Sequence, residues 1–70
     1  MARRRYIPTA YTTHYEVVVD NGETEERHSY SAEECEMAAS RAYRAKAAGA
    51  FSVHTVTYKS DGTSYTTVQR

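Results

Sequence analysis

The chain contains no leucine and no tryptophan, and it has only one cysteine, one proline and three glycines among its 70 residues. With a single Ile and a single Phe beside six Val, the four residue types Leu, Ile, Val and Phe total 8 of 70. That fraction is below the ~20% at which disorder becomes a serious alternative. Disorder also requires high net charge, whereas this chain is formally neutral and carries seven Tyr. We therefore expect a folded domain whose core consists of Tyr, Val and Ala.

The single cysteine, Cys35, excludes an internal disulfide. A chain of this length buries only ~60% of the surface that its unfolded form exposes. Its core then rarely supplies more than ~3–5 kcal/mol, and small domains commonly gain stability from a disulfide, a metal or oligomerisation. With the disulfide excluded, self-association or a bound partner is the remaining route, and we expect a homodimer.

Charge is neutral overall but strongly partitioned along the chain. Residues 1–15 carry a net charge of +3, residues 16–36 carry −7 and residues 37–70 carry +4. The apolar runs are far shorter than the ~20 residues of a membrane span, and no signal-peptide core follows the first basic residues. We expect a soluble cytoplasmic protein without membrane contact.

Two turn signals flank a helical segment and define the predicted fold. Residues 11–20 alternate like a half-buried strand, and Asn21-Gly22 has the composition of a type I′ turn leading into a second strand over residues 23–30. A two-residue loop pairs Asp20 with Glu23. The result is a hairpin that precedes the helix.

This register makes specific predictions about neighbours. It places Glu16 opposite Arg27 on the polar face and Tyr15 opposite His28 on the buried face. It also points Glu26 towards the core, which is acceptable at a sheet edge, where an inward charge discourages further pairing. We therefore place residues 23–30 at an edge.

The helix is predicted over residues 32–48. Ser31 and Glu34 have the spacing of a capping box, and Gly49 can adopt the left-handed conformation that closes a helix. Acidic residues occupy its first turn and basic residues its last, which matches the helix dipole. Small residues fall on one face at helical spacing: Cys35, Ala38, Ala42 and Ala45. On this pattern Cys35 is predicted to be a small buried core residue.

A second hairpin follows, with strands over residues 51–59 and 63–69 joined by Asp61-Gly62. Its first strand has apolar residues in both phases, which predicts either a bulge near His54–Thr55 or burial of both faces. The second option requires another surface to cover the sheet and favours dimerisation.

The predicted fold class is α+β, with a β-β-α-β-β order, a four-stranded antiparallel sheet in strand order 2-1-3-4 and one helix packed on one face. A right-handed passage from strand two to strand three gives this order. Residues 1–10, with three successive Arg and then a Pro, are predicted to be a flexible basic arm. Residues 11–70 form the single domain.

Catalysis is not predicted. The helix dipole favours a thiolate at Cys35, but three neighbouring Glu oppose it. The three His lack zinc-ligand spacing, and the chain has no glycine-rich phosphate loop, nucleophile elbow or clustered acid–base pair. We expect a non-enzyme that uses no metal and no cofactor.

The acidic residues and the tyrosines favour a protein partner. Acidic side chains of the first hairpin and of the helix start could form one negative surface, and exposed Tyr is a frequent interface anchor. Simple solvation, helix capping and ordinary sheet composition are the competing explanations. The predicted partner-binding residues are Asp20, Glu23, Glu25, Glu33, Glu34, Glu36, Tyr30 and Tyr43.

The alternative function is nucleic-acid binding, in which basic side chains contact phosphates while strand tyrosines stack on unpaired bases. Neutral overall charge and an Ala-rich helix with few base-reading side chains weigh against it. The residues that would carry it are Arg3, Arg4, Arg5, Arg41, Arg44 and Lys46.

The small size, the hairpin–helix–hairpin order, the absent Leu and the rich Ala, Arg and Thr usage together resemble the small accessory proteins carried by viruses of high-GC bacteria. This resemblance implies a non-catalytic protein that binds and modulates a host macromolecule, inhibitors of host defence included. It also implies that the cytoplasm is that of the host cell.

Overall fold

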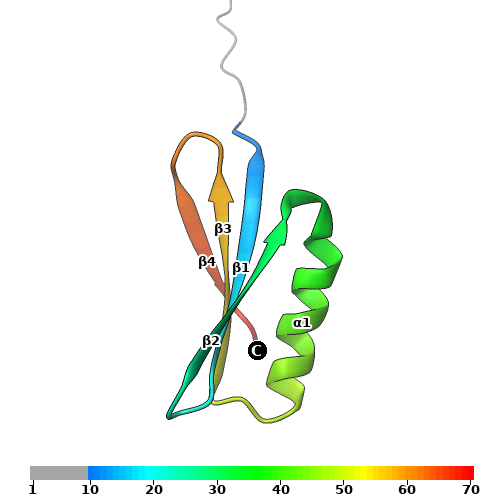
Figure 1. Cartoon of the computed structure of the whole chain (residues 1–70), viewed down its shortest axis with the longest axis vertical. Coiled ribbons are helices and arrows are strands. Elements are labelled where there is room, and N and C mark those ends of the chain that lie inside the picture. Colours follow the sequence, from blue (N-terminus) through cyan, green and yellow to red (C-terminus); the bar gives the residue numbers. More distant parts are fainter. Residues whose placement is uncertain (1–9) are drawn as a thin grey trace, which may run out of the picture.

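A computed structural model describes residues 10–70, which form one antiparallel sheet with a helix along one face (Figure 1). The strand order is β2-β1-β3-β4, so the predicted α+β class, strand order and helix position are confirmed. The predicted basic arm, with its three arginines, lies outside the described residues apart from Ala10. The elements are β1 (Thr12–Asp20), β2 (Glu25–Ser31), the 3₁₀ turn η1 (Ala32–Glu34), α1 (Cys35–Ala47), β3 (Ser52–Lys59) and β4 (Ser64–Val68).

The loop of the first hairpin is longer than the predicted two residues. Asp20 pairs with Glu25 rather than Glu23, and the Asn21 N–H donates to the Thr24 carbonyl at 3.0 Å. A type I′ turn requires a positive φ at both Asn21 and Gly22. Gly22 has a φ of 95°, but no residue other than glycine in the described part of the chain has a positive φ, so Asn21 does not meet this requirement and the predicted type I′ turn is wrong. The Asp20 carboxylate accepts the Gly22 N–H at 2.7 Å, and this local bond competes with the tighter turn.

The longer loop shifts the strand register by two residues, and the paired residues 14–20 and 25–31 keep their predicted faces. The predicted neighbours of two residues are therefore wrong: Tyr15 lies opposite Tyr30, and Glu16 lies opposite Ser29. A shift of one residue would have exchanged the two faces. Because the shift is even, Arg27 still contacts Glu16 diagonally, at 3.1 Å.

The helix begins and ends where its signals predict. The reciprocal capping box is present, with the Ser31 N–H donating to the Glu34 carboxylate at 2.9 Å. The first turn is a 3₁₀ turn, which then continues as α1. At the other end, the Ala48 N–H donates to the Arg44 carbonyl at 2.9 Å, and Gly49 adopts a φ of 103°. A side chain at that φ would be strained, so glycine suits this helix end.

The core between helix and sheet consists of short side chains. Val17, Val19 and Val53 of the sheet pack against Ala38 and Ala42 of α1. Alanines on the inner face let the helix lie close to the strands, but they bury little apolar area per residue.

The second set of alternating apolar residues in β3 lies on the face of the sheet that the helix does not cover. The predicted bulge near His54–Thr55 is wrong, because the register break lies in β1, between Thr12 and His14. Val56 and Tyr58 are half-buried on this face, and the ring of His14 stacks on Tyr58 with 4.4 Å between centroids. Aromatic stacking and neighbouring side chains therefore cover Val56 and Tyr58 only in part.

Candidate partner-binding site

The fully buried apolar side chains are small, and several of the large ones are exposed. Among the described residues, the buried hydrophobic side chains are four Val and two Ala. Tyr15, Tyr30 and Tyr58 are half-buried. Other large side chains have 55–72% of their surface exposed: Tyr11, Met37, Tyr43, Phe51 and Tyr65. Single exposed apolar residues are normal and only a contiguous patch marks a binding surface, so the surroundings of each exposed residue decide its significance.

One groove lies where the helix passes beside β2. Its volume is about 360 Å³, and it is lined by Tyr30, Glu36, Met37, Ser40, Arg41 and Arg44. Tyr30 comes from β2, and all the other residues come from α1. An exposed Met side chain beside two guanidinium groups offers apolar contact and charge-assisted hydrogen bonds in one place.

A hydrogen bond positions the side chains of this groove. The Arg41 Nε–H donates to the Tyr30 hydroxyl oxygen at 3.0 Å, which joins the helix to the edge strand. The Tyr30 ring also packs against the core cluster. The bond leaves the remaining N–H donors of the Arg41 guanidinium free to contact a partner.

The acidic residues predicted to form one surface lie at two opposite ends of the sheet. The hairpin acids lie at the β1–β2 loop, at the same end of the domain as the end of α1, whereas the helix acids lie at the start of the helix, at the other end (Figure 1). Several of them already have partners within the domain: Asp20 holds the loop, Glu25 pairs with Arg27, and Glu34 completes the capping box. Glu23, Glu33 and Glu36 are exposed, and of the six acids only Glu36 lines the groove.

The basic residues at the end of the helix also lie in two different places. Arg41 and Arg44 line the groove on the β2 side, whereas the Lys46 ammonium donates to the Phe51 carbonyl at 3.4 Å, in the connection to β3. The Arg44 Nε–H bonds the Ser40 carbonyl, also at 3.4 Å. Tyr43 is exposed and lines neither groove on the helix.

A second groove, of about 270 Å³, lies on the other side of the helix, between α1 and the β3–β4 part of the sheet. Cys35 lines it and is exposed, so the prediction of a buried core residue is wrong. The helix is rotated so that Ala38 and Ala42 point at the sheet, which leaves Cys35 at the flank. A hydrogen bond with the Cys35 side chain, together with burial, raises the pKa of Tyr15 above 10.0.

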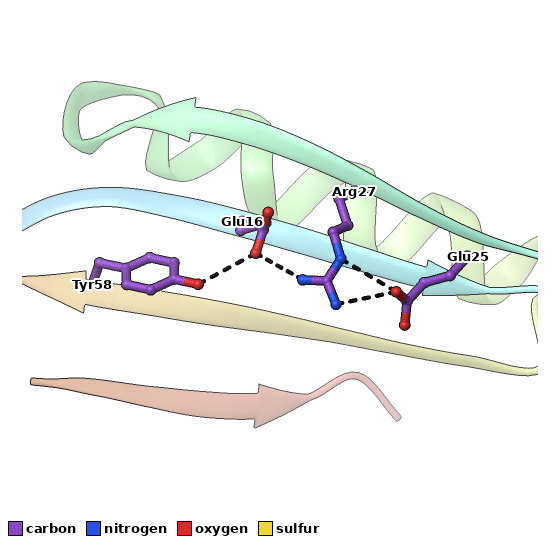
Figure 2. A network of polar contacts seen from close by, with 4 residues as sticks. All are labelled: Glu16, Glu25, Arg27 and Tyr58. Atoms are coloured by element: carbon purple, nitrogen blue, oxygen red, sulfur yellow. Dashed lines mark hydrogen bonds and ion pairs between the residues drawn. The ribbon is translucent and has the colours of Figure 1, made fainter.

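The helix-free face carries a polar network across three strands (Figure 2). Glu16 of β1 accepts hydrogen bonds from Arg27 of β2 at 3.1 Å and from the Tyr58 hydroxyl of β3 at 3.3 Å. Arg27 also pairs with Glu25 at 3.1 Å. The charges of Glu25 and then Glu16 raise the pKa of Arg27. This network joins the edge strand β2 to the two central strands, and each carboxylate in it already has a donor.

No three His, Cys, Asp or Glu side chains gather in the geometry of a metal site within residues 10–70. In the same part of the chain, α1 is too short and too polar to cross a membrane. The described site is thus a pair of open grooves along one helix.

Two contributors to the exposed surface were not identified from the sequence. No role was predicted for Met37, and Phe51 was assigned to a strand. The signal that could have identified Met37 is its spacing of four residues from Arg41, which places both on one side of the helix. Phe51 precedes β3 and is 72% exposed in the connection that follows Gly49.

Comparisons of the chain with protein-family models, with characterised proteins and with solved structures find no match.

Proposed function

We propose that the protein is a small non-catalytic interaction domain that binds a protein partner through the groove between α1 and β2. The observation that carries this proposal is the groove beside β2, in which the largely exposed Met37 lies beside Arg41 and Arg44. Exposed large apolar side chains lower the solubility of a protein, and a bound partner covers them. In keeping with the resemblance to viral accessory proteins, the partner is a host macromolecule whose activity the domain modulates, host defence included.

The lining of the groove suggests the chemistry of the partner. Met37 offers a flexible apolar surface, while Arg41 and Arg44 offer guanidinium donors. A partner segment that presents an apolar side chain beside one or two carboxylates would match both features. Tyr30 is held by Arg41 and forms a rigid wall, so little conformational entropy is lost there on binding.

The experiment compares capture by the wild type with capture by groove variants. The full chain is immobilised and exposed to a nuclease-treated extract of its native host, and the retained protein is then purified and titrated against each variant. Met37→Ser and Arg44→Glu should each weaken binding about 30-fold, the loss typical of an interface anchor. The control is Tyr11→Ser, because Tyr11 is also largely exposed but lies outside the groove.

Nucleic acid is the competing outcome of the same experiment. Nucleic-acid binding is favoured by one observation: Arg41 and Arg44 line the same groove as Tyr30. Phosphate-driven binding weakens with a slope near −0.9 per neutralised phosphate on duplex DNA in a plot of log affinity against log salt. Tight binding to an oligonucleotide at physiological salt, lost with Arg44→Glu and unaffected by Met37→Ser, would replace the proposed function.

A further inference from the structure

The two edges of the sheet differ in their protection against pairing with another strand. β2 carries four consecutive charged or titratable residues, Glu25 to His28, and Glu26 points to the helix side, where it pairs with His28 at 3.2 Å. β4 has the sequence Ser-Tyr-Thr-Thr-Val, with no charge and no proline, and all five of its residues are exposed. Inward charges and Lys or Pro on an edge discourage strand addition. Only the β2 edge has such protection.

The hydrogen-bond pattern identifies the free backbone groups of β4. Gln69 N–H donates to the Val53 carbonyl and Lys59 N–H donates to the Thr63 carbonyl, both at 2.9 Å. In an antiparallel pair the bonded positions alternate, so the odd-numbered residues of β4 bond to β3. The even-numbered residues, Ser64, Thr66 and Val68, therefore direct their N–H and C=O groups to the free edge.

We propose that a second copy of this chain pairs antiparallel along β4, with Thr66 opposite Thr66 of the second copy on a two-fold axis. The three residues with outward groups then exchange six N–H···O=C bonds between the copies, and an eight-stranded sheet results. Directly opposite residues point to the same face in such a pair, so both helices lie on one side of the sheet. An isologous contact of this kind closes at two copies.

Side-chain contacts on both faces add to the edge pairing. In this register Tyr65 of one copy lies opposite Thr67 of the other, on the helix side. Thr67 lines the 270 Å³ groove, which also includes Tyr15, Ala39 and Gln69. The exposed Tyr65 ring can therefore cover the groove of its neighbour. On the other face, the exposed Val68 lies opposite Ser64. These contacts matter because a stable interface buries about 800 Å² on each partner, more than a short edge supplies by its backbone.

Charges at the two ends of the contact are complementary. The register brings residue 62 of one copy opposite residue 70 of the other, so Asp61 lies beside Arg70 of the second copy. The same pair forms again at the opposite end by symmetry. The five strand residues between the two pairs are uncharged, so no like charges meet along the edge.

The first test measures the molecular mass of the full chain in solution, by sedimentation equilibrium at several micromolar concentrations. The wild type should be a dimer. Thr66→Pro removes only outward N–H groups and should raise the dimer dissociation constant about 30-fold or more, since two intermolecular bonds are lost. Ser29→Pro is the matched control, because Ser29 is an exposed hydroxyl residue with an outward N–H on β2, and this variant should remain a dimer.

A cross-linking test decides the register even where a proline variant fails to fold. In a Cys35→Ser background, Thr66→Cys places the two thiols on strands whose Cα atoms are about 5.5 Å apart, within disulfide range. In Thr67→Cys the Cα atoms of the two cysteines are about 7–8 Å apart, so this variant should not form a disulfide. A monomeric wild type, or equal cross-linking of both variants, overturns the inference. Either result leaves the proposed groove for a protein partner intact, since that groove lies at the other edge.

Discussion

Two neighbouring valines of β1 test whether the two faces of the sheet are packed differently. Val17 and Val18 are both fully buried, with 0% exposure. Val17 packs against α1, whereas Val18 lies on the helix-free face, between Arg27 of β2 and His54 of β3. Replacing each by alanine removes the same atoms, so any difference in the free energy of unfolding comes from the surroundings.

The transfer contribution is the same for both substitutions. Loss of two methylene equivalents costs about 1.6 kcal/mol at ~0.8 kcal/mol each. For Val17→Ala, a residual cavity of about 45 Å³ between the helix and the sheet adds about 1 kcal/mol at ~24 cal/mol per Å³. On the other face, the long Arg27 side chain can collapse into the space. We expect Val17→Ala to cost about 2.6 kcal/mol and Val18→Ala about 1.6 kcal/mol.

The assay is urea denaturation followed by circular dichroism, at one protein concentration for the wild type and both variants. The expected loss for Val17→Ala is at least half of the ~3–5 kcal/mol that a core of this size supplies. Equal losses for the two variants would refute the reasoning, because they would mean that a rigid layer covers the helix-free face as firmly as the helix covers the other.

Three further predictions concern the turns and caps. Ser31→Ala should lower the free energy of unfolding by about 1 kcal/mol in a thermal melt, and an unchanged melting temperature would show that the capping box is not needed. Gly49→Ala should cost about 1–2 kcal/mol in the same assay, because its φ of 103° strains any side chain; a stabilised variant would contradict this. The Thr63 hydroxyl and N–H lower the pKa of Asp61 below 3.8, so its contribution to stability is present above pH 3.8 and is lost as the pH falls through the lowered pKa. An NMR titration should show that pKa return towards 3.8 in Thr63→Val, and no change would exclude the hydroxyl as its main cause.

Most of the fold could be predicted because its signals are local. The capping box at Ser31, the glycine after the helix and the alternation along β1 each act within a few residues, and together they determine the element order. The loop after Asp20 was predicted two residues too short. Its length depends on a side-chain hydrogen bond to Gly22, which competes with the turn that the dipeptide favours.

The site was predictable only in its components. Tyr30 and Glu36 were assigned to one hypothesis, and Arg41 and Arg44 to its rival, whereas all four line one groove. Which flank of a helix faces which strand depends on its rotation about its own axis, and an alanine-rich face leaves that rotation undetermined from sequence. The same uncertainty explains why Cys35 was expected in the core.

The pairing of β1 with β3 has a consequence for the order in which the chain folds. Both hairpins and the helix close over short stretches of sequence, but the central strands join residues as far apart as Thr12 and Lys59. Loop closure over that distance loses more chain entropy than any local step, and non-local pairing slows folding. A preformed helix shortens the chain that separates the two hairpins. We therefore expect the capped helix to form early and the joining of β1 to β3 to limit the folding rate.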